Sequence, residues 1–335
     1  MKASIKNISY YLPEKSFTNK DFFELFPDAE KNTNLEKIGI LNRQIVTKEL
    51  ASDLAVSAAK KLFKEHNISP NDIDFVIFCA QEFDYFTPTT ACVIQNKLGI
   101  PTHAGAFDYN LGCSGFVYGL SMAKGLIESI GLKNVLLLTS STLTKTFHPK
   151  DKSSRYIFGD GAAATLISKD NDNRNIGEFV FGTDGKSFDK IIVKDGGPRN
   201  PISESSHIEK TDEYGNTHSD SCFYMNGTSI FIFGIKTVPK IIEELLSKSK
   251  LKFEDIDLFI FHQANRFLLE TLQKKVGIPD EKFFIFMENV GNTVSSTIPI
   301  ALAEAIKCGK AKNGQKIMLV AFGVGLSWSG TIIEI

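Results

Sequence analysis

The second half of the chain repeats the pattern of the first, and this duplication limits the folds open to its 335 residues. Three pairs of similar segments recur in the same order at offsets of 178 to 183 residues. They are 71–79 and 254–262, 98–101 and 276–279, and 135–138 and 317–320. Three matches in register indicate one duplicated structural unit rather than chance.

Each repeat opens with a short apolar run after an acidic turn, as in 75–79 and 258–261, which is typical of a buried parallel strand. Helical patterns lie among these strands, at 52–63, 116–127, 241–246 with its flanks, 267–276 and 298–306. Strands that alternate with helices predict parallel sheets covered on both faces. We therefore expect an α/β fold with two similar halves, residues 1–171 and 172–335.

A polar segment rich in Gly, Pro, Ser and Asp, residues 195–221, interrupts the second half. Its composition predicts a long surface excursion rather than a linker between domains. Loops of this length often act as lids over a functional site, and disorder is the alternative.

The charge balance restricts the partners of the chain. The 38 Lys and Arg residues nearly cancel the 39 Asp and Glu residues, so the net field that drives bulk binding to nucleic acid or anionic membranes is missing. The N-terminus lacks the apolar stretch of a signal peptide, and no apolar run approaches the length of a membrane span. We expect a cytoplasmic protein without a nucleic-acid or membrane partner.

The five cysteines are scattered, with no C-x-x-C pair and no metal-site spacing, which suits a reducing compartment. Cys113 differs from the others because glycines flank it in a turn that enters a predicted helix. Free backbone N–H groups and the helix dipole at such a turn favour a thiolate. Cys113 is therefore the candidate nucleophile, and a small buried hydrophobe is the alternative interpretation.

His262 and Asn292 are placed near Cys113 by the repeat. His262 ends the buried strand of the second half, at the edge where open α/β sheets bind ligands. Asn292 lies 179 residues after Cys113, at the matching helix start of the other half. An Asn there can also cap the helix, which does not conflict with a catalytic role.

A Cys, a His and an Asn admit two chemistries. Papain-like proteolysis fits the spacing, since His262 follows Cys113 by 149 residues, but the local papain signature is absent and a duplicated α/β chain is the wrong scaffold. In acyl transfer to carbon, a thiolate takes the acyl group and two neutral donors stabilise an enolate. The second chemistry needs no carboxylate paired with the His, so we favour it.

Five motifs together resemble the β-ketoacyl-ACP synthase III family of the thiolase superfamily, and the match runs along essentially the whole chain. They are Leu111-Gly112-Cys113-Ser114-Gly115-Phe116, Phe158-Gly159-Asp160-Gly161-Ala162, Phe261-His262-Gln263-Ala264-Asn265, Gly291-Asn292-Thr293 and residues 321–328. The most specific pair is H-Q-A-N followed about thirty residues later by G-N-T.

The resemblance implies a five-layer αβαβα fold, a homodimer and a decarboxylative Claisen condensation of an acyl primer with malonyl-ACP. In that reaction Cys113 carries the acyl group, while His262 and Asn292 bind the thioester carbonyl of the malonyl substrate. The backbone N–H groups of Cys113 and Val324 form the oxyanion hole. Coenzyme A and acyl carrier protein bring the substrates, and no metal or redox cofactor is implied.

The chain departs from the family pattern where coenzyme A binds. Residues 32–37 lack the Trp that stacks on adenine in housekeeping members, and Lys37 and Lys152 replace arginines that reach the nucleotide. An acyl-ACP or other carrier donor is therefore expected. Thr87 replaces a Phe that closes the acyl pocket across the dimer, and Phe86 precedes it, so a longer or branched primer is expected to fit.

Glu82 stands near the position of the catalytic Glu of hydroxymethylglutaryl-CoA synthases, where it is a candidate base for condensation without decarboxylation. The alternative is a loop carboxylate that faces water. Lys274 and Lys275 match carrier-contacting positions of the family, and Arg266 and Lys236 could join them in a local basic patch for the acidic carrier. A merely solvated charged face is the alternative.

Two further functions stay open. Some relatives transfer the acyl group to oxygen or nitrogen of a small acceptor, and such an enzyme would release no carbon dioxide from malonyl-ACP. An inactive scaffold or carrier-binding partner is disfavoured because all three reactive side chains are present.

Overall fold

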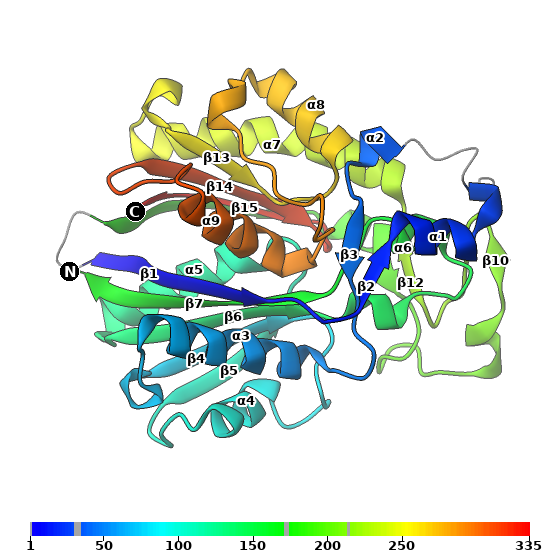
Figure 1. The fold of residues 1–335 in the computed structure, drawn as a ribbon, viewed down its shortest axis with the longest axis horizontal. Coiled ribbons are helices and arrows are strands. Elements are labelled where there is room, and N and C mark those ends of the chain that lie inside the picture. Colours follow the sequence, from blue (N-terminus) through cyan, green and yellow to red (C-terminus); the bar gives the residue numbers. More distant parts are fainter. Residues whose placement is uncertain (1, 30–34, 171–173, 213–214) are drawn as a thin grey trace.

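The computed structural model describes residues 2–29, 35–170, 174–212 and 215–335, and it is built on two stacked β-sheets (Figure 1). The first sheet has the order β1-β7-β6-β4-β5 and the second the order β13-β14-β15-β8. The strands of the first are β1 (Lys2–Tyr11), β4 (Phe75–Ala80), β5 (Gly105–Asn110), β6 (Asn134–Ser141) and β7 (Gly161–Asp170). Those of the second are β8 (Asn175–Thr183), β13 (Leu258–Phe261), β14 (Lys316–Gly323) and β15 (Ser327–Glu334).

Three layers of helices complete the fold (Figure 1). Helices α3 (Ala51–His66) and α4 (Thr90–Leu98) pack on the outer face of the first sheet. Helices α7 (Gly227–Ser249) and α8 (Arg266–Val276) cover the second sheet. Helices α5 (Gly115–Gly125) and α9 (Thr297–Lys307) lie between the sheets, and their apolar residues share one core with both. The expected five-layer αβαβα fold is thereby confirmed.

The duplication seen in the sequence is a duplication of strand pairing. In the first sheet β4 pairs with β6 and places Phe75 opposite Val135. In the second sheet β13 pairs with β14 and places Leu258 opposite Ile317, which are the residues that the repeat aligns with the first pair. All described strands of the first sheet precede residue 171 and all those of the second follow residue 174, and we propose that the boundary between the two halves lies there.

The expectation of parallel sheets is wrong in part, because both sheets are mixed. The pairs β4–β5, β4–β6 and β13–β14 are parallel, whereas β1–β7, β6–β7, β14–β15 and β15–β8 are antiparallel. Residues 324–326 alone connect β14 to β15, and a connection that short permits only the antiparallel arrangement.

Smaller elements gather at one end of the sheets (Figure 1). They are the helices α1 (Asn19–Leu25), α2 (Leu35–Ile38) and α6 (Lys152–Arg155) and the strand pairs β2 (Ser16–Thr18) with β3 (Asn42–Gln44), β9 (Ile191–Val193) with β12 (Phe223–Met225), and β10 (Lys210–Thr211) with β11 (Thr217–His218). The excursion predicted at 195–221 lies between β9 and β12, so that these two strands form its base. None of the helices in the described ranges is long and apolar enough to cross a membrane.

Candidate active site

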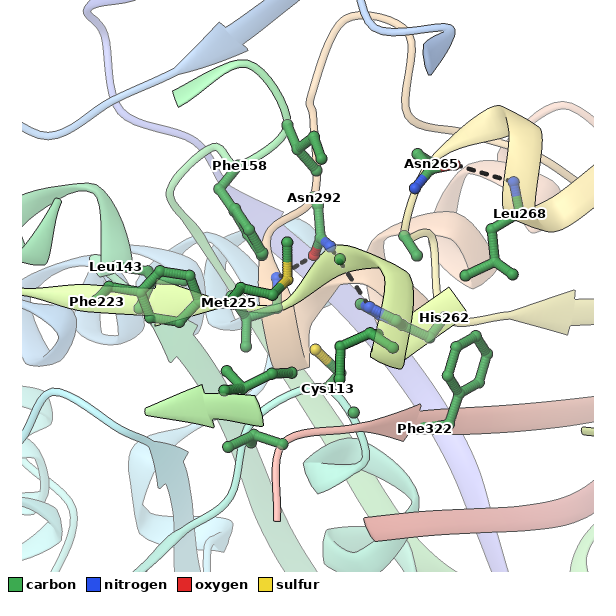
Figure 2. Close-up of a pocket in the computed structure, with 18 of the residues that line it drawn as sticks. Cys113, Leu143, Phe158, Phe223, Met225, His262, Asn265, Leu268, Asn292 and Phe322 are labelled. Carbon is green, nitrogen blue, oxygen red and sulfur yellow. Dashed lines mark hydrogen bonds between the residues drawn. The ribbon is translucent and has the colours of Figure 1, made fainter. Parts of the chain in front are cut away.

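Cys113, His262 and Asn292 line one cavity of about 110 Å³ (Figure 2). Cys113 lies two residues before α5, His262 directly follows β13, and Asn292 precedes a short 3₁₀ turn, Val294–Ser296, that leads into α9. The structure therefore brings together the three side chains that the repeat placed near one another.

Cys113 is packed tightly against the last residue of β14. A Cβ atom at Gly323 would lie 2.7 Å from Cβ and 3.0 Å from Sγ of Cys113, so only glycine leaves room for the nucleophile there. Val324, the next residue, lines the same cavity. The close approach of Gly323 therefore places the backbone at the end of β14 beside the sulfur.

The cavity makes Cys113 a thiol rather than a thiolate. Burial raises the pKa of Cys113 to about 12, and a backbone hydrogen bond offsets only part of that effect. The expectation that the helix start favours a thiolate is therefore wrong for the free protein, because loss of water around the sulfur outweighs the helix terminus.

One ring nitrogen of His262 is hydrogen-bonded to the protein, and the other points toward the cavity. Its Nδ1 lies 2.7 Å from Oγ1 of Thr297, and its Nε2 lies 3.5 Å from Nδ2 of Asn292. Burial lowers the pKa of His262 to about 3, so the imidazole is neutral at physiological pH.

The amide of Asn292 has a fixed orientation. The backbone N–H of Val294 donates to Oδ1 of Asn292 at 2.9 Å, which leaves the Nδ2 donors turned toward His262 and the cavity (Figure 2). The carbonyl of Asn292 accepts from the Gly159 N–H at 3.1 Å, and Phe158 forms a β-bridge with Asn292. The Phe158-Gly159-Asp160 motif therefore supports the loop that positions Asn292.

The two ends of the cavity differ in character (Figure 2). On one side of Cys113 the lining is buried and apolar, with aromatic contacts of about 5.6 to 5.9 Å among Phe147, Phe158 and Phe223 behind it. This closed end is lined by Leu143, Phe158, Ile191, Phe223 and Met225.

The opposite end of the cavity reaches the surface. Phe231 lines it and stacks on Phe267 at 5.4 Å between ring centroids, and the Phe267 side chain is partly exposed. Asn265 lies at this end as well, where its side chain caps α8 by accepting from the Leu268 N–H (Figure 2). Phe158 and Asn265 belong to motifs visible in the sequence, but the other residues of the two ends share no motif and were not predicted.

The carboxyl group of Glu82 is buried although the residue as a whole is half-buried, and Glu82 does not line the cavity. Its Oε2 accepts the Thr142 N–H at 3.3 Å, its Oε1 has no hydrogen-bond partner among the described residues, and burial raises its pKa to about 7. The alternative of a carboxylate that faces water is therefore wrong. The neighbouring Gln81 lines the cavity beside Cys113 and was missed by the sequence analysis.

The other predicted binding residues lie outside the cavity. Phe86 is 93% exposed and Thr87 is exposed too, so neither closes the pocket of its own chain. Lys37 places its Nζ 5.7 Å from the ring of Phe267, close to the open end. Lys152 begins α6. The missing Trp was noted over residues 32–37, of which 32–34 fall outside the described residues.

The predicted basic patch lies on α8. Lys274 and Lys275 are exposed in its last turn. Arg266, at its first turn, lies 3.4 Å from the carboxylate of Glu288, so part of its charge is balanced. Across the described ranges, no three His, Cys, Asp or Glu side chains gather as metal ligands would.

Comparison with known proteins bears out the fold and its class. The sequence profile of 3-oxoacyl-[acyl-carrier-protein] synthase III matches residues 107–185, and the profile of the C-terminal part of that family matches residues 246–335. The β-ketoacyl-[acyl-carrier-protein] synthase III of Clostridium perfringens is 35% identical over 333 residues, 99% of each chain. That of Fusobacterium nucleatum is 35% identical over 331 residues, 98% of each chain.

Solved structures agree with these relatives. A crystal structure of a 3-oxoacyl-(acyl-carrier-protein) synthase III superposes with a TM-score of 0.97 at 48% identity over the full length of both chains. The 3-oxoacyl-(acyl-carrier protein) synthase of Burkholderia xenovorans superposes with a TM-score of 0.91 at 31% identity, covering all of this chain and 94% of the other.

The duplicated αβαβα fold with these relatives defines an acyltransferase of the thiolase-like condensing enzymes. Within that class, the chain belongs to the β-ketoacyl-acyl-carrier-protein synthase III family of fatty-acid synthesis.

Proposed function

We propose that the protein condenses an acyl primer with malonyl-ACP through an acyl group carried on Cys113. The observation that supports this most is the composition of the cavity. A thiol and two neutral hydrogen-bond donors, His262 and Asn292, meet in a buried site, and no Asp or Glu is among the described residues that line it. Such a site can stabilise an enolate without removing a proton from carbon.

In the first half-reaction the primer thioester binds with its carbonyl oxygen at the N–H groups of Cys113 and Val324. The sulfur of Cys113 forms a bond to the carbonyl carbon, and the bond between that carbon and the carrier sulfur breaks. The thiol proton ends on the released carrier thiol. Because the pKa of Cys113 is about 12, this proton must leave as the new bond forms.

In the second half-reaction the thioester oxygen of the malonyl group lies between His262 and Asn292. The 3.5 Å separation of Nε2 and Nδ2 allows one oxygen to lie about 2.9 Å from both. The bond to the carboxylate breaks, carbon dioxide leaves, and the electron pair moves onto that oxygen as an enolate. The enolate carbon then attacks the acyl carbonyl, and the sulfur of Cys113 departs and regains a proton.

The closed end of the cavity would receive the primer chain. Leu143, Phe158 and Phe223 present apolar side chains there, which fits a short or medium alkyl chain. A second copy of the chain would bring its Phe86 and Thr87 to this pocket in a homodimer, as the family resemblance implies. Lys274 and Lys275 would meet the acidic carrier protein.

Mass spectrometry of the intact protein tests the proposal. Acyl-CoA and acyl-ACP donors of several lengths are offered to the wild-type protein and to Cys113→Ala, and the acylated protein is then mixed with malonyl-ACP. We expect an acyl adduct on the wild-type protein alone, followed by carbon dioxide and a β-ketoacyl product. The proposal fails if no donor acylates the wild-type protein, or if the variant is acylated equally.

The same experiment separates the alternatives. Transfer to a small oxygen or nitrogen acceptor would consume the acyl adduct without carbon dioxide. Condensation with Glu82 as base would retain the malonyl carboxylate, and this role has no support from the geometry because the Glu82 side chain does not line the cavity.

A further inference from the structure

A row of buried polar groups runs behind the two proposed enolate donors. Nε2 of His262 lies 3.5 Å from Nδ2 of Asn292, which is a hydrogen bond only when Nε2 accepts, and Nδ1 of His262 lies 2.7 Å from Oγ1 of Thr297. The row ends on the carbonyl oxygen of Val294, 3.0 Å from the same Thr297 hydroxyl. Each of the three side chains is at most 3% exposed, so water does not compete for these bonds.

The number of protons in this row is limited, because neutral imidazole carries one N–H and a hydroxyl carries one proton. If Thr297 donates to the Val294 carbonyl, Nδ1 of His262 must carry the ring proton, and Nε2 faces the cavity as a bare acceptor. If Thr297 instead donates to Nδ1, the ring proton lies on Nε2 and points into the cavity, where Nε2 and the Asn292 amide are then two donors with no hydrogen bond between them. The orientation of one hydroxyl therefore decides whether His262 is a donor to the substrate.

The Val294 carbonyl does not need the hydroxyl. It already accepts the backbone N–H of Thr297 at the end of the 3₁₀ turn. The hydroxyl of Thr297 can turn to Nδ1 without leaving a buried carbonyl unpaired, which would otherwise be costly. The imidazole of His262 is also neutral, so it carries a single ring proton that can lie on either nitrogen.

We propose that Thr297 is a positioning residue that donates to Nδ1 of His262 and thereby holds the ring proton on Nε2, where it reaches the malonyl thioester oxygen. This inference rests on the proposed function and adds a residue to it. It concerns one half-reaction alone. Decarboxylation uses the Nε2 proton, whereas acylation of Cys113 uses the backbone oxyanion hole.

Two variants isolate the hydroxyl. Thr297→Val keeps the shape of the side chain and removes the hydroxyl, while Thr297→Ser keeps the hydroxyl and removes a methyl group. We expect Thr297→Val to slow malonyl-ACP decarboxylation by at least about tenfold, a part of the 10²–10³ that removal of the donor itself costs. Cys113 acylation should change by less than about threefold in either variant, and Thr297→Ser should decarboxylate near the wild-type rate.

A matched control is Thr165→Val in β7. The Thr165 hydroxyl is likewise buried but has no hydrogen-bond partner within the part of the chain that the structure describes, so its removal should leave both half-reactions unchanged. A general loss of packing would slow acylation and decarboxylation alike in Thr297→Val, and in Thr297→Ser as well.

The tautomer is measured directly by ¹⁵N NMR of histidine-labelled protein, with the His262 signals assigned by their loss in His262→Gln. We expect the wild-type protein to show a protonated Nε2 and an acceptor Nδ1, and Thr297→Val to show a larger share of the other tautomer. A protonated Nδ1 in the wild-type protein overturns the inference even if no variant folds. So does a Thr297→Val protein that decarboxylates at the wild-type rate.

Failure of the proposed function looks different. In that case the wild-type protein itself releases no carbon dioxide from malonyl-ACP, whatever the NMR spectrum of His262 shows.

Discussion

The buried carboxyl group of Glu82 should make the stability of the protein fall as the pH rises. Burial is the main cause that raises its pKa from 4.5 to about 7; the hydrogen bond from Thr142 opposes this, and the nearby Asp160 carboxyl adds to it. Between these two values the folded protein retains a proton that the unfolded chain has released. Raising the pH through this window therefore favours unfolding.

The size of the effect follows from the gap between the two pKa values. Each pKa unit corresponds to about 1.4 kcal/mol, so this gap sets a ceiling of about 3 kcal/mol. Of this, about 2 kcal/mol should appear between pH 5 and pH 8. Glu82→Gln removes the titration and nearly preserves the shape. Its free energy of unfolding should therefore rise by about 2 kcal/mol relative to the wild-type protein between those two pH values.

Urea unfolding of both proteins at pH 5, 6.5 and 8, followed by circular dichroism and by the fluorescence of Trp328, measures this difference. The packing cost of the amide in Glu82→Gln is the same at every pH, so it cancels when the stability difference between variant and wild type is compared across pH. Glu281→Gln, the same substitution at an exposed side chain, serves as the control for the exchange itself. A difference between Glu82→Gln and wild type that does not vary with pH would refute the reasoning, and loss of condensation in the variant would instead support Glu82 as a base.

Three further predictions concern the cavity. The rate at which iodoacetamide alkylates Cys113 should rise about tenfold per pH unit from pH 7 to 9, because only the thiolate reacts and its pKa is about 12; a plateau near pH 7, after subtraction of the Cys113→Ala background, would contradict this. Asn292→Ala should lower malonyl-ACP decarboxylation by about 10²–10³ while the acyl adduct still forms, as measured by carbon dioxide release and intact mass; equal loss of both steps would argue for misfolding. Gly323→Ala should block acylation, since its Cβ would lie 2.7 Å from Cβ of Cys113, whereas Gly125→Ala, which has open space around it, should not.

Much of the architecture was predictable from the repeat because buried strands of duplicated halves carry matching apolar runs. The pairing of Phe75 with Val135 and of Leu258 with Ile317 follows the sequence alignment of the two halves. The antiparallel strands escaped prediction because β1, β7, β8 and β15 lie outside the repeated segments. Their direction depends on how the chain connects, which short apolar runs do not encode.

The site was predictable where a residue follows directly from a strand or helix end, and much less so elsewhere. His262 comes immediately after β13, so its place at the sheet edge was visible in the sequence. Phe223 reaches the cavity from the base of the long excursion, and no local pattern indicates that return. The sequence pointed to Glu82 as a site residue, whereas its neighbour Gln81 lines the cavity. Both lie in the loop after β4, where side chains no longer alternate regularly between two faces.

The protonation of Cys113 shows a different limit of sequence reasoning. The flanking glycines and the helix start were correctly located in the sequence, but they account only for the electrostatic field that favours a thiolate at the sulfur. The cost of removing the thiolate from water depends on side chains distant in sequence, such as Leu143, Phe158 and Phe223, which enclose the cavity.

The same loss of water favours the proposed reaction over its alternatives. With Cys113 as a thiol and His262 as a neutral imidazole, the described residues that line the cavity carry no formal charge before substrate enters. A malonyl carboxylate is poorly stabilised in such an environment, and its departure as carbon dioxide removes the charge from that position. The charge passes to the thioester oxygen, where the N–H donors of His262 and Asn292 lie in a medium of low dielectric and act more strongly than in water. A reaction that needed a carboxylate base would be disfavoured by the same burial, because burial would hold that carboxyl group in its protonated form.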